Sequence, residues 1–382
     1  MGNLNKPNIR FPEFEGEWGI KRLEEVSTIN PATNKLPDKF IYIDLESVTD
    51  GELTKEVVVF KNEAPSRAQR VLEKDDILFQ MVRPYQKNNL YFDRDGDYVA
   101  STGYAQIKTK QSSRYIYQYL HLQKFVNEVI ERCTGTSYPA INSNDLAKIC
   151  ICFPTLPEQQ KIASFFTAID QKITQLKKKK DLLEQYKKGV MQKIFNQKIR
   201  FKDDDEQEFP KWEKKKIMNI FKINAGGDID KKHFSKEKTD TFIYPVFSNS
   251  ESNKGLFGYS DLFKVEEQSI TVTGRGALGY AVARYEKYYP IVRLLILIPI
   301  IDADVYFYQN LINKTKFFVE STGVPQLTAP QISNYKISYP HLTEQKKIAI
   351  FLSAIDDKIN RTQMKIEKAE VWKKGLLQQM FV

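Results

Sequence analysis

The feature that most constrains this chain is a long stretch that occurs twice. Residues 154–195 begin PTLPEQQKIASFFTAIDQKI and end YKKGVMQKIF, and residues 340–381 begin PHLTEQKKIAIFLSAIDDKI and end WKKGLLQQMF. The copies lie at a constant offset of 186 residues, across which Glu158 matches Glu344 and Asp170 matches Asp356. A repeat of this length fixes the architecture before any local assignment is made.

Both copies are predicted to be long helices. Proline and glutamate suit a first helical turn, although Thr343 stands where the first copy has Pro157, so a looser first turn is expected there. Apolar residues then recur at spacings of four and three, which is typical of a coiled-coil seam. Two unrelated surface helices are the alternative, but equal seams in one chain favour pairing. About 38 residues at 1.5 Å each give a helix of roughly 57 Å.

The seam has mostly apolar members and a few polar interruptions. It comprises Ile162, Phe166, Ile169, Ile173, Leu176, Leu183, Val190 and Ile194 in the first copy and Ile348, Leu352, Ile355, Ile359, Ile366, Leu376 and Met380 in the second, interrupted at Lys180, Lys187, Thr362 and Lys373.

The segments before each helix also correspond to one another. At an offset of 194 residues Trp18 matches Trp212. The tripeptide IRF at 9–11 also recurs, at 199–201, just past the first long helix. We therefore divide the chain into a first globular domain (1–154), a first long helix (155–196), a linker (197–207), a second globular domain (208–340) and a second long helix (341–382).

Each globular domain is predicted to be rich in strands, with some helix. Strand character is found at 57–60, 76–82 and 97–109, helical spacing at 113–133, a turn at TGTSYPAIN and an apolar run before Pro154; the second domain follows the same order, with a helix around 303–319 and the turn STGVPQL. The predicted fold class is α+β: two similar mixed α/β domains separated by long helices that pair as an antiparallel coiled coil with pseudo-two-fold symmetry.

The net charge of +10 comes from the long helices and the first residues after the first one. Residues 157–200 carry +7 and residues 343–382 carry +3, which accounts for the whole excess. A basic helix pair could lie near nucleic acid, or KKKK at 177–180 could be a solvated helix face. No apolar run is long enough to span a membrane, no signal peptide is recognisable, and three cysteines suggest a reducing compartment, so we expect a cytoplasmic protein.

Sequence motifs for catalysis are mostly missing. TGRGALG at 273–279 is formally G-x-G-x-x-G, but the following YAVARYEKYY is predicted to be a strand, whereas a dinucleotide site needs a helix there. The sequence has neither an ATP-binding phosphate loop nor the Asn/Asp-Pro-Pro-aromatic motif of amino-methyltransferases. Cys150 and Cys152 are expected to point together into the core rather than to bind a metal. We predict neither a catalytic nor a metal site.

The remaining candidates are polar and basic residues in predicted loops. Such side chains can recognise DNA bases, since Arg pairs with guanine, and Asn or Gln with adenine, in the major groove. Taken singly, each such residue is more often an ordinary turn residue, but TGTSYPAIN and STGVPQL occupy equivalent places. The candidate DNA-binding residues are Arg83, Ser101, Thr102, Thr136, Ser137 and Tyr138 in the first domain and Ser248, Asn249, Arg275, Thr322 and Gln326 in the second.

A globular domain followed by a helix opening PxLxEQxKIAxFxxAID, both repeated, resembles the specificity subunit of type I restriction–modification systems over essentially the whole chain. The residues that match the helix motif, and that are expected to pair the helices or contact partners, are Glu158, Gln159, Ile162, Phe165, Ile169 and Ile173, with Glu344, Gln345, Ile348, Phe351, Ile355 and Ile359 in the second copy.

The resemblance implies a division of labour between subunits. Each globular domain would be a target recognition domain reading one half of a bipartite sequence in double-stranded DNA, and the helices would set the spacer and hold two modification subunits. Adenine methylation with S-adenosylmethionine would belong to those partners, and ATP- and magnesium-dependent translocation and cleavage to restriction subunits, with no cofactor on this chain. The alternatives are a DNA methyltransferase or nuclease acting alone and a coiled-coil scaffold that does not bind DNA.

Overall fold

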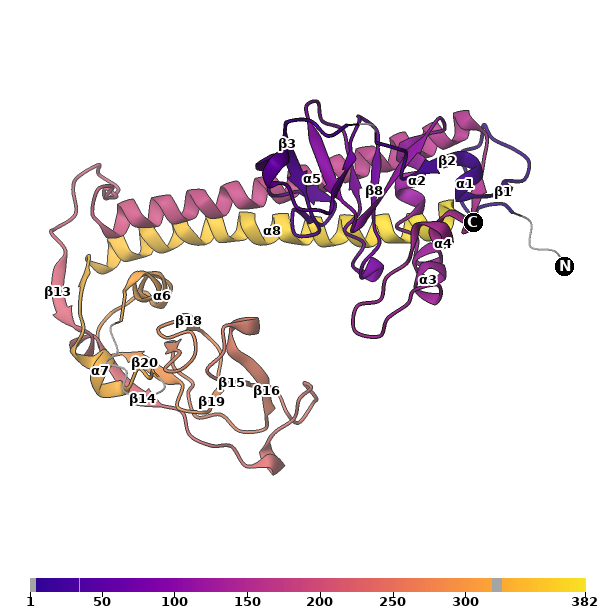
Figure 1. Ribbon diagram of the computed structural model, residues 1–382. Helices are drawn as coiled ribbons and strands as arrows, with labels where there is room; N and C mark the ends of the chain where they lie inside the picture. Colours follow the sequence, from indigo (N-terminus) through magenta and orange to yellow (C-terminus); the bar gives the residue numbers. More distant parts are fainter. Residues whose placement is uncertain (1–4, 34, 318–324) are drawn as a thin grey trace. The chain divides into compact units, whose positions relative to one another are not determined.

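The computed structural model describes residues 5–33, 35–317 and 325–382, which form two compact units. Unit 1 runs to Lys178 and includes Gln363–Val382, and unit 2 comprises Lys179–Thr362. Each unit therefore combines one globular domain with segments of both long helices (Figure 1). Among the described residues, no helix is both long and apolar enough to cross a membrane.

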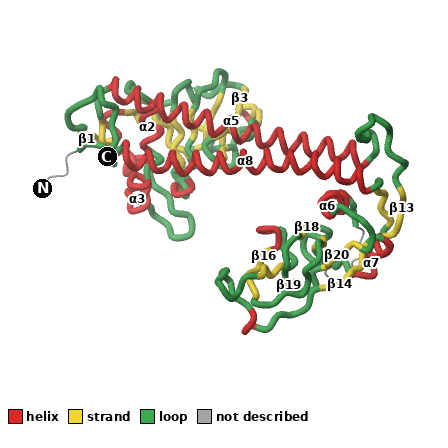
Figure 2. The backbone as a smooth tube through the Cα atoms, turned by 180° about the vertical axis from the view of Figure 1, so that it is seen from behind, coloured by secondary structure: helices red, strands yellow, loops and turns green. Residues whose placement is uncertain are grey.

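The long helices are α5 (Leu156–Phe195) and α8 (Leu342–Met380). In unit 1 the first part of α5 lies beside the last part of α8 (Figures 1 and 2). Asp170 contacts Lys373 at 2.6 Å and Lys177 contacts Glu370 at 3.1 Å, so residue numbers rise along one helix as they fall along the other. The two segments are antiparallel, as predicted.

The globular domain of unit 1 has two four-stranded sheets and two smaller ones, in the orders β2-β11-β8-β9, β6-β3-β10-β7, β1-β12 and β4-β5. Their strands are β1 (Gly19–Arg22), β2 (Ser27–Ile29), β3 (Lys39–Ile43), β4 (Val48–Thr49), β5 (Glu52–Leu53), β6 (Val57–Phe60), β7 (Ala68–Val71), β8 (Ile77–Gln80), β9 (Leu90–Tyr91), β10 (Tyr98–Ser101), β11 (Tyr104–Thr109) and β12 (Cys150–Phe153), and the short helices are α1 (Leu23–Val26), α2 (Ser113–Tyr119), α3 (Gln123–Glu131) and α4 (Ser143–Ala147).

The globular domain of unit 2 repeats this plan, with sheet orders β14-β20-β17-β18, β16-β15-β19 and β13-β21. Its elements are β13 (Glu213–Lys216), β14 (Phe221–Ala225), β15 (Tyr244–Phe247), β16 (Leu256–Ser260), β17 (Ser269–Val272), β18 (Ala281–Arg284), β19 (Tyr289–Pro290), β20 (Leu295–Pro299), α6 (Val305–Lys314), α7 (Ala329–Asn334) and β21 (Lys336–Tyr339). In both domains the second sheet contains one parallel pair, β3 with β10 and β15 with β19. In the other, four-stranded sheet of each domain, β8 and β17 are both the third strand.

Two predicted elements are each divided in the structure. The expected strand at 97–109 is β10 and β11, which belong to different sheets because the chain turns at Thr102, whose N–H donates to the Arg67 carbonyl at 2.9 Å. The expected helix at 113–133 is α2 and α3, because Leu122 adopts an extended backbone (φ −62°, ψ 138°) between them. Both helices bury their apolar face in one core, which is why the sequence spacing looked continuous.

Each domain shares its main core with the long helices. In unit 1 the core includes Trp18 and Phe166, and Met380 and Phe381 at the end of α8 are buried in it. In unit 2 the end of α5, with Ile194 buried, packs into the core beside Leu352 and Phe307. The helix ends are therefore part of the folding units.

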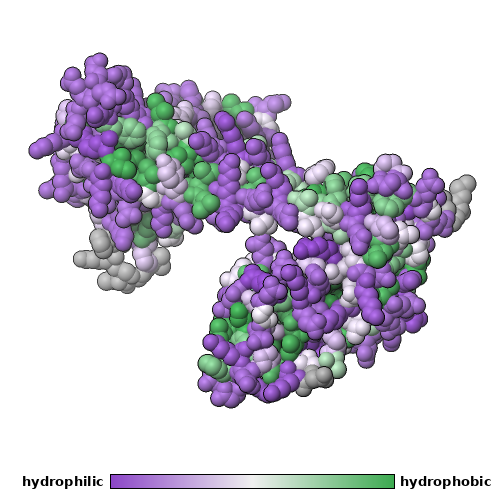
Figure 3. Space-filling view, turned by 90° about the horizontal axis from the view of Figure 1, so that it is seen from above, coloured by the Kyte–Doolittle hydropathy of each residue, from purple (hydrophilic) through white to green (hydrophobic). Residues whose placement is uncertain are grey.

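The cysteine prediction was wrong for one residue. Cys152 is buried in the core, but Cys150 is exposed, because it lies at the first position of β12, paired with exposed Arg22 at the end of β1. Hydrophilic residues cover most of the face shown in Figure 3, with smaller hydrophobic areas between them.

Candidate nucleic-acid interface

The first turn of α5 carries a buried carboxylate that anchors the helix to the globular domain. Glu158 is 1% exposed. Its two oxygens accept from Arg10 Nε at 2.7 Å and Nη2 at 2.8 Å, and Oε1 also accepts from Trp18 Nε1 at 3.2 Å. The bond to this carboxylate raises the pKa of the Arg10 guanidinium above its ordinary value, as expected for a charge-assisted bidentate pair.

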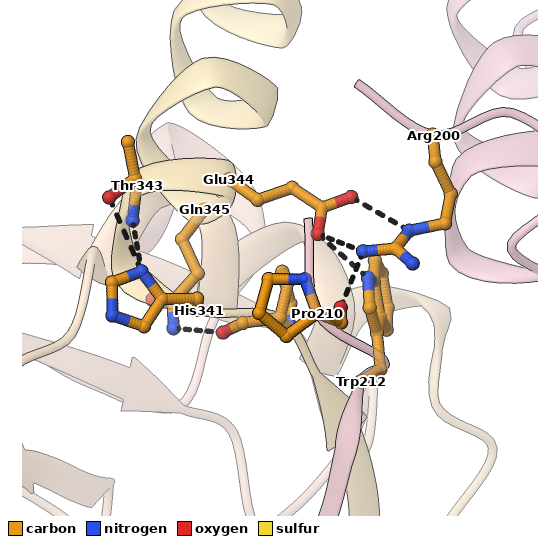
Figure 4. Close-up of polar contacts among 8 residues, drawn as sticks. Arg200, Pro210, Trp212, His341, Thr343, Glu344 and Gln345 are labelled. Atoms are coloured by element: carbon orange, nitrogen blue, oxygen red, sulfur yellow. Dashed lines mark hydrogen bonds and ion pairs between the residues drawn. The ribbon is translucent and has the colours of Figure 1, made fainter. Parts of the chain in front are cut away.

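The first turn of α8 repeats this anchor in unit 2 (Figure 4). Glu344 is fully buried and accepts from Arg200 Nε at 3.1 Å, Arg200 Nη2 at 2.6 Å and Trp212 Nε1 at 3.2 Å. Arg10 and Arg200 are the central residues of the repeated IRF tripeptide. The repeats of IRF and of the tryptophan are visible in the sequence, but they lie more than 130 positions from the glutamate, so no local pattern indicates the contact.

The following glutamines tie each helix to the strand before it. Gln159 Nε2 donates to the Pro154 carbonyl at 2.8 Å, and Gln345 Nε2 donates to the Pro340 carbonyl at 2.9 Å. The backbone N–H groups of both glutamines make the same helical bond, at 3.0 Å. The looser turn expected at Thr343 is therefore not found. These glutamates and glutamines were predicted to pair the helices or to contact partners. Their side chains instead bond to the globular domain of their own unit, and contact with partner subunits stays a prediction.

The apolar motif residues lie where helix, partner helix and domain meet. Ile162, Ile169 and Ile173 are buried in the unit 1 core, while Ile348 and Ile355 are buried, and Ile359 partly buried, in unit 2. The half-buried phenylalanines contact their surroundings edge to face: Phe165 lies 5.8 Å from Phe11 and 6.2 Å from Trp372 of α8, and Phe351 lies 5.6 Å from Phe201.

Two equivalent ion pairs, one in each unit, join the long helices and were not predicted from the sequence. In unit 1 Asp170 of α5 contacts Lys373 of α8 at 2.6 Å, and in unit 2 Lys187 of α5 contacts Asp356 of α8 at 2.6 Å. At the offset of 186 these are one contact made twice. A helix of each domain completes it, since Gln118 of α2 donates to Asp170 and Tyr306 of α6 donates to Asp356. The four residues belong to the AID and KKG motifs, which occur in both long helices and could have indicated the contact.

In unit 1 the candidate DNA-binding residues gather on three loops that meet at Met81. The Met81 N–H donates to the Gly103 carbonyl at 3.0 Å, and its carbonyl accepts from Ile141 N at 3.1 Å. These bonds join the loop after β8, the turn between β10 and β11, and the loop at 134–141. The Arg83 guanidinium lies over the Tyr138 ring, 4.2 Å from its centroid. Thr136, Ser137 and Tyr138 are exposed on the third loop.

In unit 2 three loops meet at Gly274. Its N–H donates to Asn249 Oδ1 at 2.7 Å, and its carbonyl accepts from Leu327 N at 2.8 Å. A Cβ on Gly274 would lie 2.7 Å from the Leu327 carbonyl oxygen, so glycine is required for this approach. Arg275 is exposed and donates to Gln326 at 3.1 Å.

Not every candidate is placed to touch a ligand. Ser101 is only 4% exposed, and its hydroxyl accepts from the Gly103 N–H at 3.2 Å, so it stabilises the turn beneath Thr102. Asn249 uses its amide to hold Gly274 and the Val292 carbonyl, while Ser248 is half-buried beside it. Thr322 lies outside the described residues.

Two of the three loops in each set correspond, while the third differs, because the Asn249 loop follows β15, the equivalent of β3, whereas the Gly103 turn follows β10, the equivalent of β19. Ile141 and Leu327 each immediately precede the N-cap of a short helix, Asn142 for α4 and Thr328 for α7. Each donates its N–H to the loop that follows the equivalent strand, β8 or β17. TGTSYPAIN and STGVPQL therefore lead to equivalent backbone contacts, as their sequence position suggested.

The glycine-rich loop lacks the helix that a dinucleotide site needs. It joins β17 to β18, which pair antiparallel from Val272 and Ala281, so a strand follows it as predicted. A helix N-terminus, the element that binds a pyrophosphate in such motifs, does not follow these glycines. Within the described ranges no cluster of three His, Cys, Asp or Glu side chains could hold a metal ion.

Comparison with known proteins assigns the chain to a family. A family model for the type I restriction modification DNA specificity domain matches residues 15–185 and again 210–371. A putative type I specificity subunit, S.MpnORF507P of Mycoplasma pneumoniae, is 30% identical over 69% of this chain and 70% of its own length. The MjaVIII specificity subunit of Methanocaldococcus jannaschii is 24% identical over 97% of this chain and 92% of its own length.

Solved structures share the fold. The crystal structure of a type I restriction-modification system S subunit from M. genitalium aligns with a TM-score of 0.65 at 14% identity, covering 99% of both chains. A chain from a study of assembly and conformational transition of the type I R-M system aligns with a TM-score of 0.58 at 19% identity, covering 95% of this chain and 97% of that one. With two copies of the specificity domain, the chain belongs to the type I restriction–modification DNA specificity family.

Proposed function

We propose that this chain is the DNA-recognition subunit of a type I restriction–modification complex, in which each globular domain reads one half of a bipartite target in double-stranded DNA. The observation that carries the proposal is the repeated loop set. In two domains of the same fold, the loop after the equivalent strand, β8 or β17, is bonded to the loop before a short helix, with different side chains in each domain. One binding role directed at two different sequences accounts for a shared backbone and divergent surfaces.

The two long helices set the distance between the half-sites. Their 40 and 39 residues correspond to about 60 Å of helix, which is longer than one DNA turn of about 34–36 Å. An unread spacer of fixed length would therefore separate the two half-sites. The buried Glu158 and Glu344 anchors support this role, because they fix each helix rigidly to its own domain.

The helices also offer surface for partner subunits. On the unit 1 part of α8, Met364 and Val371 are seven residues apart and therefore share one face, and both are exposed, at 54% and 72%, as is the neighbouring Trp372 at 54%. We assign this face to the docking of a modification subunit, two of which would join the complex, with restriction subunits completing it. An exposed apolar stripe on a helix is a common docking surface.

Catalysis is assigned to those partners. S-adenosylmethionine would bind the modification subunits, ATP and magnesium the restriction subunits, and no cofactor this chain, in the cytoplasm. An independent methyltransferase or nuclease would modify DNA as the purified chain alone and would bind S-adenosylmethionine. A scaffold without a DNA role would fail to shift a target duplex in a gel even in the presence of its partners.

Shortening both helices tests the spacer role. Residues 175–181 lie between Asp170 and Lys187 on α5, and residues 361–367 lie between Asp356 and Lys373 on α8. Deleting both heptads therefore keeps the two equivalent Asp–Lys pairs, although it removes Lys177 and its pair with Glu370. Seven residues correspond to about 10 Å of helix, or roughly three base pairs. Methylation mapping in a strain that carries the variant should find both half-sites unchanged and the spacer shorter. An altered half-site with an unchanged spacer would refute the assignment.

A further inference from the structure

Each domain presents an arginine on the loop that follows the equivalent strand of its sheet. Strand β8 ends at Gln80 and strand β17 ends at Val272, and both are third in equivalent four-stranded sheets. Arg83 and Arg275 each follow three residues later. Both arginines also contact a residue on the equivalent neighbouring loop, Tyr138 in one domain and Gln326 in the other.

Arg83 is held in place by backbone and by stacking. Its backbone is left-handed (φ 53°, ψ 54°), an uncommon conformation for a residue with a side chain, and its N–H donates to the Pro139 carbonyl at 2.8 Å. The guanidinium stacks on Tyr138, a residue that is 64% exposed. Among the described residues none forms an ion pair or a hydrogen bond with this guanidinium. Its N–H groups are therefore oriented and available.

Arg275 is positioned by a hydrogen bond instead. One Nη donates to Gln326 Oε1 at 3.1 Å, and the backbone on either side is fixed because Gly274 is bonded to both Asn249 and Leu327. The side chain is exposed, and within the part of the chain that the structure describes it has no carboxylate partner. Because no carboxylate of the described residues neutralises this guanidinium, the acceptor atoms of a ligand can bind it.

We propose that Arg83 and Arg275 each read one guanine in the major groove, with Tyr138 and Gln326 as the positioning residues that hold the two guanidinium groups. The inference rests on the proposed function and names the base that each half-site must contain. Guanine presents two acceptors, O6 and N7, which match the forked N–H groups of arginine, and stacking on Tyr138 reduces the freedom that Arg83 would lose on binding.

A phosphate is the competing partner, because arginine also binds phosphate through two bonds. The two partners predict different outcomes. Loss of a phosphate contact weakens binding equally for all sequences, whereas loss of a base contact relaxes one position of the target. A bidentate arginine–guanine contact discriminates by roughly five- to 150-fold, so the effect is large enough to read in methylation maps.

The test replaces each arginine by lysine in the full chain, within its complex in the cell, and maps methylated sites genome-wide. R83K should relax one G·C position in one half-site by at least about fivefold, and R275K should do the same in the other half-site only. Y138A should relax the position affected by R83K while Y138F does not, and Q326A should relax the position affected by R275K. R22K, at an exposed site on β1, is the matched control and should leave the target unchanged.

Three results would overturn the inference. These are a target half without any G·C pair, a uniform fall in methylation with an unchanged sequence preference, and loss of methylation at every site in R83K or R275K. In each variant, the half-site that is read by the unsubstituted domain should keep its sequence, and it thereby reports correct folding. Failure of the proposed function looks different, since the wild-type gene would then direct no methylation to a bipartite sequence.

Discussion

Replacing Glu344 by alanine should destabilise unit 2 more than any single surface change. The carboxylate is fully buried and accepts three hydrogen bonds, two of them from Arg200. Removing one partner of a buried pair typically costs about 3–5 kcal/mol, because the other charge is left unpaired. The Arg200 side chain is 24% exposed and can recover some hydration, so we expect the lower end, about 3 kcal/mol.

Hydrogen exchange in increasing urea, followed by mass spectrometry, can measure this loss for each unit separately. Peptides from residues 179–362 report unit 2, and peptides from residues 5–178 serve as an internal reference. The matched control is E206A, which breaks the exposed Lys202–Glu206 pair and should cost less than about 1 kcal/mol. A double-mutant cycle with R200A should give a large coupling energy. Equal effects of E344A and E206A on unit 2 would refute the anchor.

Three further predictions concern unit 1. F381A removes a buried ring that lies 5.3 Å from Tyr115 and 5.7 Å from Phe166 and should cost about 3 kcal/mol in urea unfolding, whereas V371A, at an exposed site, should change stability by less than about 0.5 kcal/mol. D170K and K373D should each destabilise by about 1 kcal/mol, since the pair is partly exposed, and the double exchange should recover most of that loss; no recovery would argue against the contact. Burial lowers the pKa of His121 from 6.5 to about 4, so the unfolded chain takes up the proton first, and stability should fall as the pH drops from about 6.5 towards 4. H121N should flatten that part of the unfolding free energy against pH, and an unchanged slope would contradict the assignment.

The sequence by itself determined the repeat and therefore the plan of the molecule. A periodic apolar seam present twice is enough to give two long helices, because helix periodicity is a local property of the chain. The matched order of strands, turns and short helices likewise gave two similar domains. The family resemblance followed from the residues at the start of each helix, and the family model matches both copies.

Only the tertiary structure decided what the motif residues do. Glu158 and Glu344 appeared to be pairing residues, but Arg10 and Arg200, more than 140 positions away in sequence, bury them against the domains. The exchanged Asp–Lys pairs and the division of 97–109 between two sheets arise in the same way. Such contacts join residues whose spacing follows no period, and a single sequence records the residues without recording which of them meet.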